Sequence, residues 1–475
     1  MKRIFLIALF FALCGADNLS AQLAVSGRVF VDRNGNGVCD WGEKRLRGVA
    51  VSDGDTVVLT SVGGRYSFES NNAENIFVVA PRNYTTSATR ISNPRGVSGG
   101  DLALLRRPTP DRFKALFVGD VHVEDSTMLD YAERSIFKYL SDGAGADFNV
   151  WLGDVVNESP EWIAPMAERI EVLPNPSWVA IGNHDYDKNR KDAPSTAFES
   201  AFGLKTYAFH YGRTCFVVIE SPHNEASVRF LKNLLSVLPD DECVVLCLHY
   251  PLTYKSYNHI VEMLDQRECP SLIMTAHHHT VERAILGRHT SHVVVGSVCA
   301  IWWRGWLDDE GLPLPYMQCG SLRNVYEAEC DGTDFRLHYR PLRNEGQMRV
   351  WIAGSEPSDL RIKDLAEVAP GMVVVNVFGA GEDAQVSMSI DSAEPVKMSY
   401  SPMTDPEVLR LRQISLEANF SRKDPRRTVY RRADSPHIWQ LMLPDDLATG
   451  THIITITATD SRGLNAQHSV GYVKE

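Results

Sequence analysis

The sequence has few features that would place it in a membrane or on nucleic acid. After its first residues it contains no apolar run long enough to span a bilayer. Its 48 lysines and arginines are outnumbered by 60 aspartates and glutamates, and the net charge of -12 argues against general nucleic-acid binding. With 44% hydrophobic and 23% charged residues, the chain of 475 residues has a globular composition. Its length indicates several domains rather than one core.

Cysteine motifs are also lacking. Nine cysteines occur, none forms a C-x-x-C pair, and their spacing fixes no disulfide connectivity. Cys243 and Cys247 fall in an apolar run, where buried free thiols are the simpler expectation. The sequence contains no internal repeat and no low-complexity segment.

The N-terminus has the pattern of a secretory signal peptide. Lys2 and Arg3 precede an apolar stretch from residue 4 to 13, and small residues lead to Ala21, after which we expect cleavage. The apolar stretch is too short for a membrane anchor. Lipid attachment at Cys14 is the alternative, although Leu13 fits poorly before a lipidated cysteine. The sequence thus predicts an exported protein, periplasmic or extracellular, with residues 1–21 as its signal peptide.

Three stretches of different texture follow and predict three domains. Residues 22–108 contain short strands with polar turns, which predicts a β-sandwich module. Residues 109–345 alternate strands and helices, with helices expected from Ser126 to about Gly143, from Ser159–Pro160 and from about Ala226. Residues 346–475 return to strands and predict a C-terminal β-rich domain. The predicted fold is therefore an α/β domain with all-β sandwich domains at both ends.

The first module contains one sharp motif. Oxygen-bearing side chains stand at positions 1, 3, 5, 9 and 12 of a loop, with Gly37 at position 6, as in calcium-binding loops. The flanking segments are strands rather than the helices of an EF-hand, so bound calcium would have a structural role. The alternative is an Asn-Gly turn with solvated acids. The candidate calcium ligands are Asp32, Asn34, Asn36, Asp40 and Glu43.

In the middle domain, five apolar runs each end on polar residues able to bind a metal. Buried strands whose ends present ligands in one crevice are the usual way in which open α/β sheets build a site. A single such ending is often a strand that meets solvent, but five in succession are hard to explain in that way. The endings are Asp120 and His122, Asp154, Asn183 and His184, His249, and His277 with His279.

The mixture of ligands suits two divalent ions. A pair of ions about 3.5–4 Å apart needs a shared carboxylate and further His and O ligands on each side. Neutral imidazole together with carboxylate favours two transition metals such as Mn, Fe or Zn over Ca. A water that bridges such ions loses a proton readily and becomes a nucleophile.

The order of these motifs, D-x-H, G-D-x-x-N, G-N-H-D, a lone His and x-H-x-H, resembles the calcineurin-like metallophosphoesterases. The resemblance covers about Leu116 to Thr280 and implies two β-sheets packed between helices. It further implies that Asp120, His122, Asp154 and His279 hold one metal and that Asp154, Asn183, His249 and His277 hold the other. By the same resemblance, His184 is not a ligand but contacts the phosphate and assists the leaving group. With its β modules, the chain also resembles three-part exported phosphoesterases of Bacteroidetes.

Strand alternation supports part of this set. In the segment "MTAHHHT", His277 and His279 can face one target while His278 points away. Two departures from the family pattern occur. Ala276 replaces the usual glycine before the last histidines, which is a mild change unless that position needs positive φ. Asn157 stands where many members have Asp, which could weaken the orientation of a ligand.

The predicted function is hydrolysis of a phosphomonoester or phosphodiester by a metal-bridging hydroxide, with Asp154 and His184 as the catalytic residues. An aromatic cluster after the last metal motif could form the wall of a substrate pocket or pack between domains. The alternative function is a surface or periplasmic binding protein whose metal centre is structural. The candidate pocket residues are Trp302, Trp303, Trp306 and His259.

Overall fold

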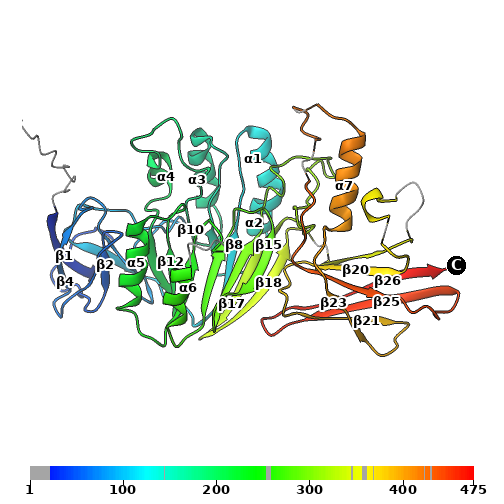
Figure 1. The fold of residues 1–475 in the computed structure, drawn as a ribbon. Coiled ribbons are helices and arrows are strands. Elements are labelled where there is room, and N and C mark those ends of the chain that lie inside the picture. Colours follow the sequence, from blue (N-terminus) through cyan, green and yellow to red (C-terminus); the bar gives the residue numbers. More distant parts are fainter. Residues whose placement is uncertain are drawn as a thin grey trace, which may run out of the picture.

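The structure is a computed structural model that describes residues 22–475, except for residues 144, 253–257, 344–345, 356–360, 367, 422 and 428–429. The predicted signal peptide and Cys14 lie outside the described residues. Figure 1 shows an elongated arrangement, with the N-terminal strands at one end, the α/β part in the middle and the C-terminal strands at the other end. Of the described helices, none has both the length and the apolar character needed to cross a membrane.

The N-terminal strands form two small sheets. One has the order β4-β1-β7-β6 and the other β3-β2-β5. Their apolar residues, such as Val29 and Phe77, join the same hydrophobic core as the neighbouring six-stranded sheet of the α/β part. The N-terminal part is therefore packed on the α/β part rather than tethered beside it. The strands are β1 (Leu23–Val31), β2 (Ala50–Ser52), β3 (Val57–Leu59), β4 (Arg65–Ser70), β5 (Phe77–Val78), β6 (Tyr84–Thr85) and β7 (Leu102–Arg106).

Two sheets make up the α/β part. The five-stranded sheet has the order β10-β9-β8-β17-β18, and the six-stranded sheet has the order β11-β12-β13-β14-β16-β15. Strands β8, β9 and β10 are mutually parallel, as are β12, β13, β14 and β16. The bounds are β8 (Arg112–Val118), β9 (Phe148–Trp151), β10 (Ser177–Val179), β11 (Tyr207–Tyr211), β12 (Thr214–Val218), β13 (Cys243–Cys247), β14 (Ser271–Thr275), β15 (Val281–Ile285), β16 (Thr290–Val295), β17 (Asn324–Asp331) and β18 (Asp334–Pro341).

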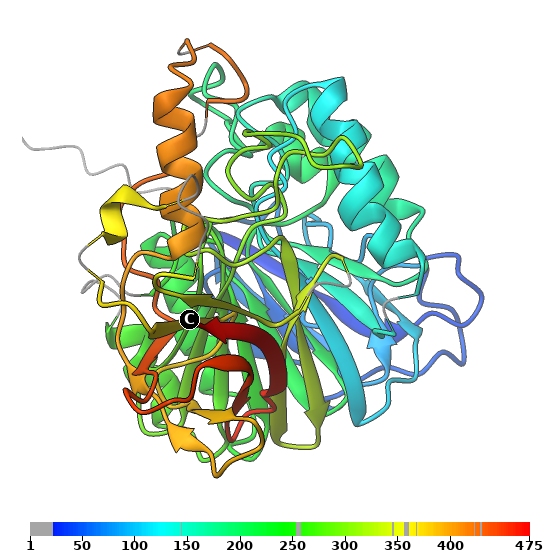
Figure 2. The ribbon, with the colours of Figure 1, turned by 90° about the vertical axis from the view of Figure 1, so that its right-hand side faces the viewer.

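Alternation along β8 shows how the layers are stacked. Ala115 and Phe117 face the core that lies between the two sheets, whereas Leu116 and Val118 face the core under α1 and α3. On the outer face of the six-stranded sheet, α5 and α6 complete the sandwich (Figures 1 and 2). The predicted class, two sheets between helices, is thus confirmed. The bounds are α1 (Ser126–Ala132), α2 (Lys138–Ser141), α3 (Ile163–Glu171), α4 (Thr196–Ala201), α5 (Glu225–Leu235) and α6 (Asn258–Asp265).

The helix starts differ in detail from the predicted ones. Asp125, rather than Ser126, caps α1 by accepting a hydrogen bond from the N–H of Met128. A π-helical turn over Glu133–Phe137 joins α1 to α2, so the predicted single helix is continuous but not regular. The helix predicted from Ser159–Pro160 begins as a 3-10 turn, Pro160–Trp162, before α3.

The C-terminal part is a pair of four-stranded sheets with the orders β19-β20-β24-β23 and β22-β21-β25-β26, packed through their apolar faces. It also contains a helix that the strand texture of this region does not predict, α7 (Pro406–Glu417). Asp405 caps this helix, and Pro406 occupies its first turn, where a missing N–H costs nothing. The strands are β19 (Met348–Ile352), β20 (Met372–Val377), β21 (Gln385–Ile390), β22 (Val396–Lys397), β23 (Ser399–Tyr400), β24 (Ile438–Met442), β25 (Gly450–Thr459) and β26 (Asn465–Lys474).

Candidate metal centre

The predicted ligands meet at the carboxyl ends of five strands. Three of these strands, β8, β9 and β10, belong to the five-stranded sheet, and two, β13 and β14, belong to the six-stranded sheet. The two sheets therefore contribute to one crevice, in the position where open α/β sheets bind ligands. We call the seven residues gathered here the candidate metal centre: Asp120, His122, Asp154, Asn183, His249, His277 and His279.

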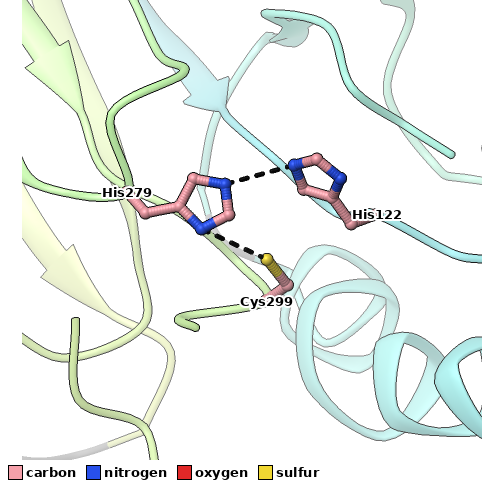
Figure 3. A group of neighbouring side chains, drawn as sticks. All are labelled: His122, His279 and Cys299. Carbon is pink, nitrogen blue, oxygen red and sulfur yellow. Dashed lines mark hydrogen bonds between the residues drawn. The ribbon is translucent and has the colours of Figure 1, made fainter. Parts of the chain in front are cut away.

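One half of the candidate metal centre surrounds the imidazoles of His122 and His279. Their Nε2 atoms lie 3.2 Å apart (Figure 3). Oδ1 of Asp120 lies 3.6 Å from each of them. The Nδ1 atom of His279 is turned away and contacts the carbonyl oxygen of Ala300 at 2.8 Å. That contact fixes the ring so that its other nitrogen faces the cluster.

The other half surrounds His249. Its Nε2 lies 3.1 Å from Oδ1 of Asn183 and 3.2 Å from Nδ1 of His277. Its Nδ1 contacts the carbonyl oxygen of Leu152 at 2.9 Å, which orients the ring in the same manner as for His279. Three potential ligand atoms of different residues therefore converge on a second point.

Asp154 stands between the two halves. Its Oδ2 lies 3.5 Å from Nε2 of His122 and 3.0 Å from Nε2 of His249. Its Oδ1 accepts a hydrogen bond of 2.8 Å from the backbone N–H of His184, which holds the carboxylate plane. A single oxygen that faces both clusters has the position of a bridging ligand.

The donor set fits divalent cations. Asp120 Oδ1 is buried and makes no hydrogen bond with any described residue, which is costly for an anion unless a cation completes it. Burial lowers the pKa of His279 to about 4, and burial together with the charge of His249 lowers the pKa of His277 to about 4. Both imidazoles are thus neutral at pH 7, as metal ligands must be. Among the described residues, three groups of side chains have metal-ligand spacing: His122, Asp154 and His184; Asp154, His249 and His277; and His122, His279 and Cys299.

His249 behaves differently without cations. Burial alone would lower its pKa, but the charge of Asp154 and the hydrogen bond to it raise the pKa of His249 to about 9. The same pairing holds the pKa of Asp154 below its ordinary value although burial opposes this. Cation binding at this half must therefore release a proton from His249.

His184 lies beside the centre and is half-buried. Its ring centre is 4.9 Å from that of His122, and its Nδ1 is 3.2 Å from Oε1 of Glu158. Burial lowers the pKa of His184, so the ring is neutral at pH 7. His184 therefore lies close enough to His122 and Asp154 to share a ligand group with them, and its role as a non-ligand stays a prediction.

Asp185 supports the centre and was missed by the sequence reasoning. Its buried carboxylate accepts hydrogen bonds from the backbone N–H groups of Asp154 at 2.8 Å, Gly182 at 2.8 Å and Val156 at 3.1 Å. Burial and the charge of Asp154 raise the pKa of Asp185 to about 7. The aspartate of the motif G-N-H-D could have indicated this role, because an aspartate between ligand-bearing loops can accept hydrogen bonds from their backbone N–H groups.

Cys299 is a second residue missed by the sequence reasoning. Its sulfur lies 3.7 Å from Nδ1 of His279 (Figure 3). It also lies 3.1 Å from Oγ of Ser297. Burial raises the pKa of the Cys299 thiol to about 12, so it is protonated and inert at neutral pH. No spacing in the sequence indicated that this cysteine would approach the centre.

Left-handed backbone conformations are concentrated in the ligand loops. Asp120, His122, Asp154, His277 and His279 have φ values between 51° and 72°. Such conformations are unfavourable for residues with a Cβ and persist where the surrounding structure enforces them. Strand alternation is therefore not the reason that two of three consecutive histidines face the centre, because β14 ends at Thr275.

The remaining residues noted in the sequence take these positions. His278 Nδ1 lies 3.5 Å from Oε1 of Glu282; His278 belongs to none of the groups with metal-ligand spacing but lines the cavity beside the centre. Ala276 does not have a positive φ, so its methyl group is accommodated without backbone strain. The Asn157 amide donates to the carboxylate of Glu124 rather than to a residue of the candidate metal centre.

The predicted substrate-pocket residues separate from one another. Trp302 lines a cavity beside the centre, with its ring centre 4.4 Å from that of His279. Trp303 is buried and donates to the carbonyl oxygen of Val121 at 2.7 Å, and Trp306 packs against Phe420. His259 is exposed on α6 and does not line that cavity.

The predicted calcium loop is closed by its own hydrogen bonds. Asp32 accepts from the N–H groups of Gly35 and Gly37, at 2.7 and 2.8 Å. The Asp40 carboxylate accepts from the amides of Asn34 and Asn36, and Glu43 accepts from the N–H groups of Arg33 and Asp40. The loop thus gathers the five side chains, but their oxygens are engaged with internal donors.

Comparisons with known proteins agree with this geometry. Residues 113–281 match the family model described as "Calcineurin-like phosphoesterase", and residues 292–465 match "C terminal of Calcineurin-like phosphoesterase". No curated protein matches the chain.

Solved structures with similarity to the chain include three from eukaryotes. A dimetal phosphatase from Danio rerio is 12% identical and covers 49% of this chain and 97% of its own, with a TM-score of 0.35. Vps29 from Chaetomium thermophilum is 16% identical and covers 47% and 88%, with a TM-score of 0.25. A 5'-nucleotidase from Candida albicans is 10% identical and covers 77% and 92%, with a TM-score of 0.32.

The two family models follow one another along the chain, and the first spans every residue of the candidate metal centre. The predicted enzyme class is thereby confirmed over the alternative of a binding protein. The chain belongs to the calcineurin-like phosphoesterase family and is a phosphoester hydrolase with the C-terminal domain of that family.

Proposed function

We propose that this protein is an exported hydrolase that cleaves a phosphomonoester or phosphodiester at a centre of two divalent transition metals. The position of Asp154 supports this proposal most directly. Its Oδ2 lies within 3.5 Å of a nitrogen in each half of the candidate metal centre. One carboxylate oxygen shared between two sets of His and O ligands is the arrangement that a pair of cations requires.

The chain's residues take separate roles in this proposal. Asp120, His122 and His279 hold the first cation, Asn183, His249 and His277 hold the second, and Asp154 joins them. When bound, the cations neutralise charge on the phosphoester and activate a water for attack on phosphorus. His184, whose ring centre lies 4.9 Å from that of His122, donates its ring N–H to the departing oxygen.

The test is hydrolysis of p-nitrophenyl phosphate and bis-p-nitrophenyl phosphate by protein stripped of metals and reloaded separately with Mn, Zn or Fe. We expect metal-dependent turnover that Asp154→Asn and His249→Ala reduce by at least 10³-fold, by analogy with other residues acting as a unit. The ratio of the two rates distinguishes a monoesterase from a diesterase. Retained turnover in metal-saturated Asp154→Asn protein would contradict the assignment.

Adjacent histidines provide a matched control. His277→Ala removes a candidate ligand and should reduce both metal content and turnover. His278→Ala removes a neighbouring imidazole that lies near Glu282 instead, so metal content should stay at two ions per chain. An equal loss of metal in both variants would mean that the wrong histidine was assigned.

We further propose a structural calcium ion in the loop formed by residues 32–43, and export through cleavage after Ala21. The loop has the ligand order of a calcium site, and calcium would replace internal donors at its carboxylates. Binding should raise the melting temperature in calcium over that in a calcium chelator, and Glu43→Gln should abolish the difference. Mass spectrometry of the mature protein tests whether its N-terminus is Gln22.

A further inference from the structure

A cavity of about 480 Å³ opens beside the candidate metal centre. Its volume is several times that of a phosphate group, so it has space for the alcohol portion of a substrate. Residues that follow strands of both sheets of the α/β part line this cavity, and so does a residue of the C-terminal part. The lining residues used below are His122, His277 and His279 at the inner end, and Trp302, Arg304 and Arg431 beyond them.

Two arginines in this cavity have no counter-charge. Neither Arg304 nor Arg431 forms an ion pair with any carboxylate of the described residues, and both are exposed. Of the described lining residues, Glu124 alone is acidic, and its carboxylate is engaged by the amide of Asn157. Among the described lining residues, arginines therefore outnumber carboxylates by two to one.

Another cavity of the same volume provides a comparison. It lies near α1 and α2 and also contains several cationic side chains. There, Arg134 pairs with Asp130 at 2.9 Å and Arg343 pairs with Asp308 at 2.9 Å, while Lys138 pairs with Asp142 at 2.5 Å. Arg323 also lines that cavity and forms no ion pair with a described carboxylate, but it is buried. Three of the four cationic side chains there are thus paired, whereas both arginines at the candidate metal centre are unpaired and exposed.

Arg431 is held at the cavity by its backbone. The Gln318 side chain donates to the carbonyl oxygen of Arg431 at 2.6 Å and accepts from its N–H at 3.0 Å. The neighbouring Tyr430 hydroxyl donates to the carbonyl oxygen of Tyr316 at 3.1 Å. These bonds leave the guanidinium of Arg431 available while they fix the position from which it reaches into the cavity.

Trp302 supplies a flat surface between the ligands and the arginines. Its side chain is 43% exposed although one part of the ring lies against His279. An exposed indole in a cavity can accept a planar ring by stacking.

We infer that this cavity selects phosphoesters whose alcohol carries a second anionic group, bound by Arg304 and Arg431, and a ring that lies on Trp302. A guanidinium binds phosphate or carboxylate oxygens through paired N–H donors. In the reaction, water adds to phosphorus, the ester P–O bond breaks, and the alcohol takes up a proton and leaves with its second anion intact. The inference rests on the proposed function, because it assumes that the scissile phosphate lies at His122 and His279.

The kinetic experiment compares adenosine 5'-monophosphate with adenosine 3',5'-bisphosphate, which share the base and differ by one phosphate. With metal-loaded enzyme we expect kcat/KM to be at least tenfold higher for the bisphosphate, mainly through KM. Arg304→Gln and Arg431→Gln should each lower that ratio severalfold, and the double variant should bring it close to one. Rising ionic strength should lower the ratio as well.

Arg432→Gln is the matched control. Arg432 follows Arg431 directly and is also exposed, but it pairs with Asp364 and does not line the cavity. The ratio should be unchanged in this variant. A kcat/KM ratio near one in the wild type would overturn the inference, because the second phosphate would then not be recognised. An equal loss of kcat/KM for both substrates in the Arg304 and Arg431 variants would also overturn it, because the arginines would then bind the scissile phosphate.

A binding experiment separates this inference from the proposed function. Calorimetry with hydrolysis-resistant pentane-1,5-bisphosphonate and pentylphosphonate needs no turnover. Tighter binding of the bisphosphonate that is lost in Arg431→Gln supports the anion subsite even if no phosphoester is hydrolysed. Equal binding of the two compounds together with normal turnover of p-nitrophenyl phosphate would leave the hydrolase and remove the subsite.

Discussion

At the scale of single residues, the centre depends on groups that contact ligands rather than on ligands alone. The types of metal ligand could be predicted from the sequence, because the seven predicted side chains all follow apolar runs. That these side chains come together in space is seen only in the folded structure. Asp185 and Cys299 could not be predicted. Their roles arise from backbone donors and a ring nitrogen that come from distant loops, and residue type alone does not indicate such contacts.

Asp185→Asn tests this support. The change replaces one acceptor oxygen by an NH₂ group; even if this group takes the place of Oδ1, the hydrogen bond from the N–H of Val156 is lost and one repulsive contact is formed. We expect metal affinity to fall by roughly 10–100-fold and the metal-free protein to lose about 1–3 kcal/mol of stability. Isothermal titration and urea unfolding measure the two effects.

Asp192→Asn is the control for that substitution, because Asp192 is exposed on a nearby turn. Unaltered metal affinity in Asp185→Asn protein would show that Asp154 is held without this carboxylate.

At the scale of secondary-structure elements, glycines before the ligands let the strand ends approach one another. A Cβ built on Gly182 would lie 2.8 Å from Cγ of Asp154, and one on Gly119 would lie 2.6 Å from the carbonyl oxygen of Gly296. The apolar strands themselves could be predicted from the sequence. The left-handed backbone conformations after these strands could not be predicted, because aspartate and histidine have no strong preference for φ near 50°.

Gly182→Ala should therefore displace Asp154 although it changes no ligand. We expect metal content to fall by at least tenfold, because substitutions of residues that hold metal ligands in place typically reduce metal affinity by this amount. The melting temperature of the metal-free protein should also be lower. Metal analysis after dialysis and thermal unfolding provide the measurements.

Gly471→Ala serves as the comparison, since a Cβ at that position in β26 meets nothing within 4 Å. It should keep full metal content. Full metal content in both variants would mean that the close approach at Gly182 is relieved without moving Asp154.

At the scale of the whole molecule, a buried polar network joins the C-terminal part to the α/β part. Asn376 donates to the carbonyl oxygen of Cys319 at 2.9 Å and to Asp405 at 2.6 Å, and Oδ1 of Asn376 lies 2.6 Å from Nδ1 of His437. Arg349 pairs with Asp405 at 3.0 Å and also contacts the carbonyl oxygen of Gly320. The cap of α7 is thus part of the interface, which a strand-rich sequence pattern did not indicate.

This network predicts a loss of stability in acid. Burial lowers the pKa of His437 to about 4, whereas the unfolded chain has a histidine pKa of about 6.5. The unfolded state therefore binds the proton first, so this contribution is complete above pH 6.5 and is lost as the pH falls toward 4. Between pH 7 and 5 it should amount to about 2 kcal/mol.

Urea unfolding of metal-free wild-type and His437→Gln protein at pH 7 and pH 5 measures this contribution. It is the amount by which the loss of unfolding free energy between the two pH values is larger in the wild type than in the variant. His468→Gln, in β26, is the control. Equal acid losses in wild-type and His437→Gln protein would show that His437 is not the group responsible.

The strand order of the five-stranded sheet has a consequence for the timing of synthesis. Strand β8, which leads into Asp120 and His122, lies between β9 and β17, and β17 ends only at Asp331. A nascent chain that has just passed His279 carries all seven predicted ligands, yet one of the two partner strands of β8, β17, has not been made. Arg431 is added later still. The centre can therefore assemble only after most of the polypeptide has been translated. Incomplete chains should not hydrolyse phosphoesters.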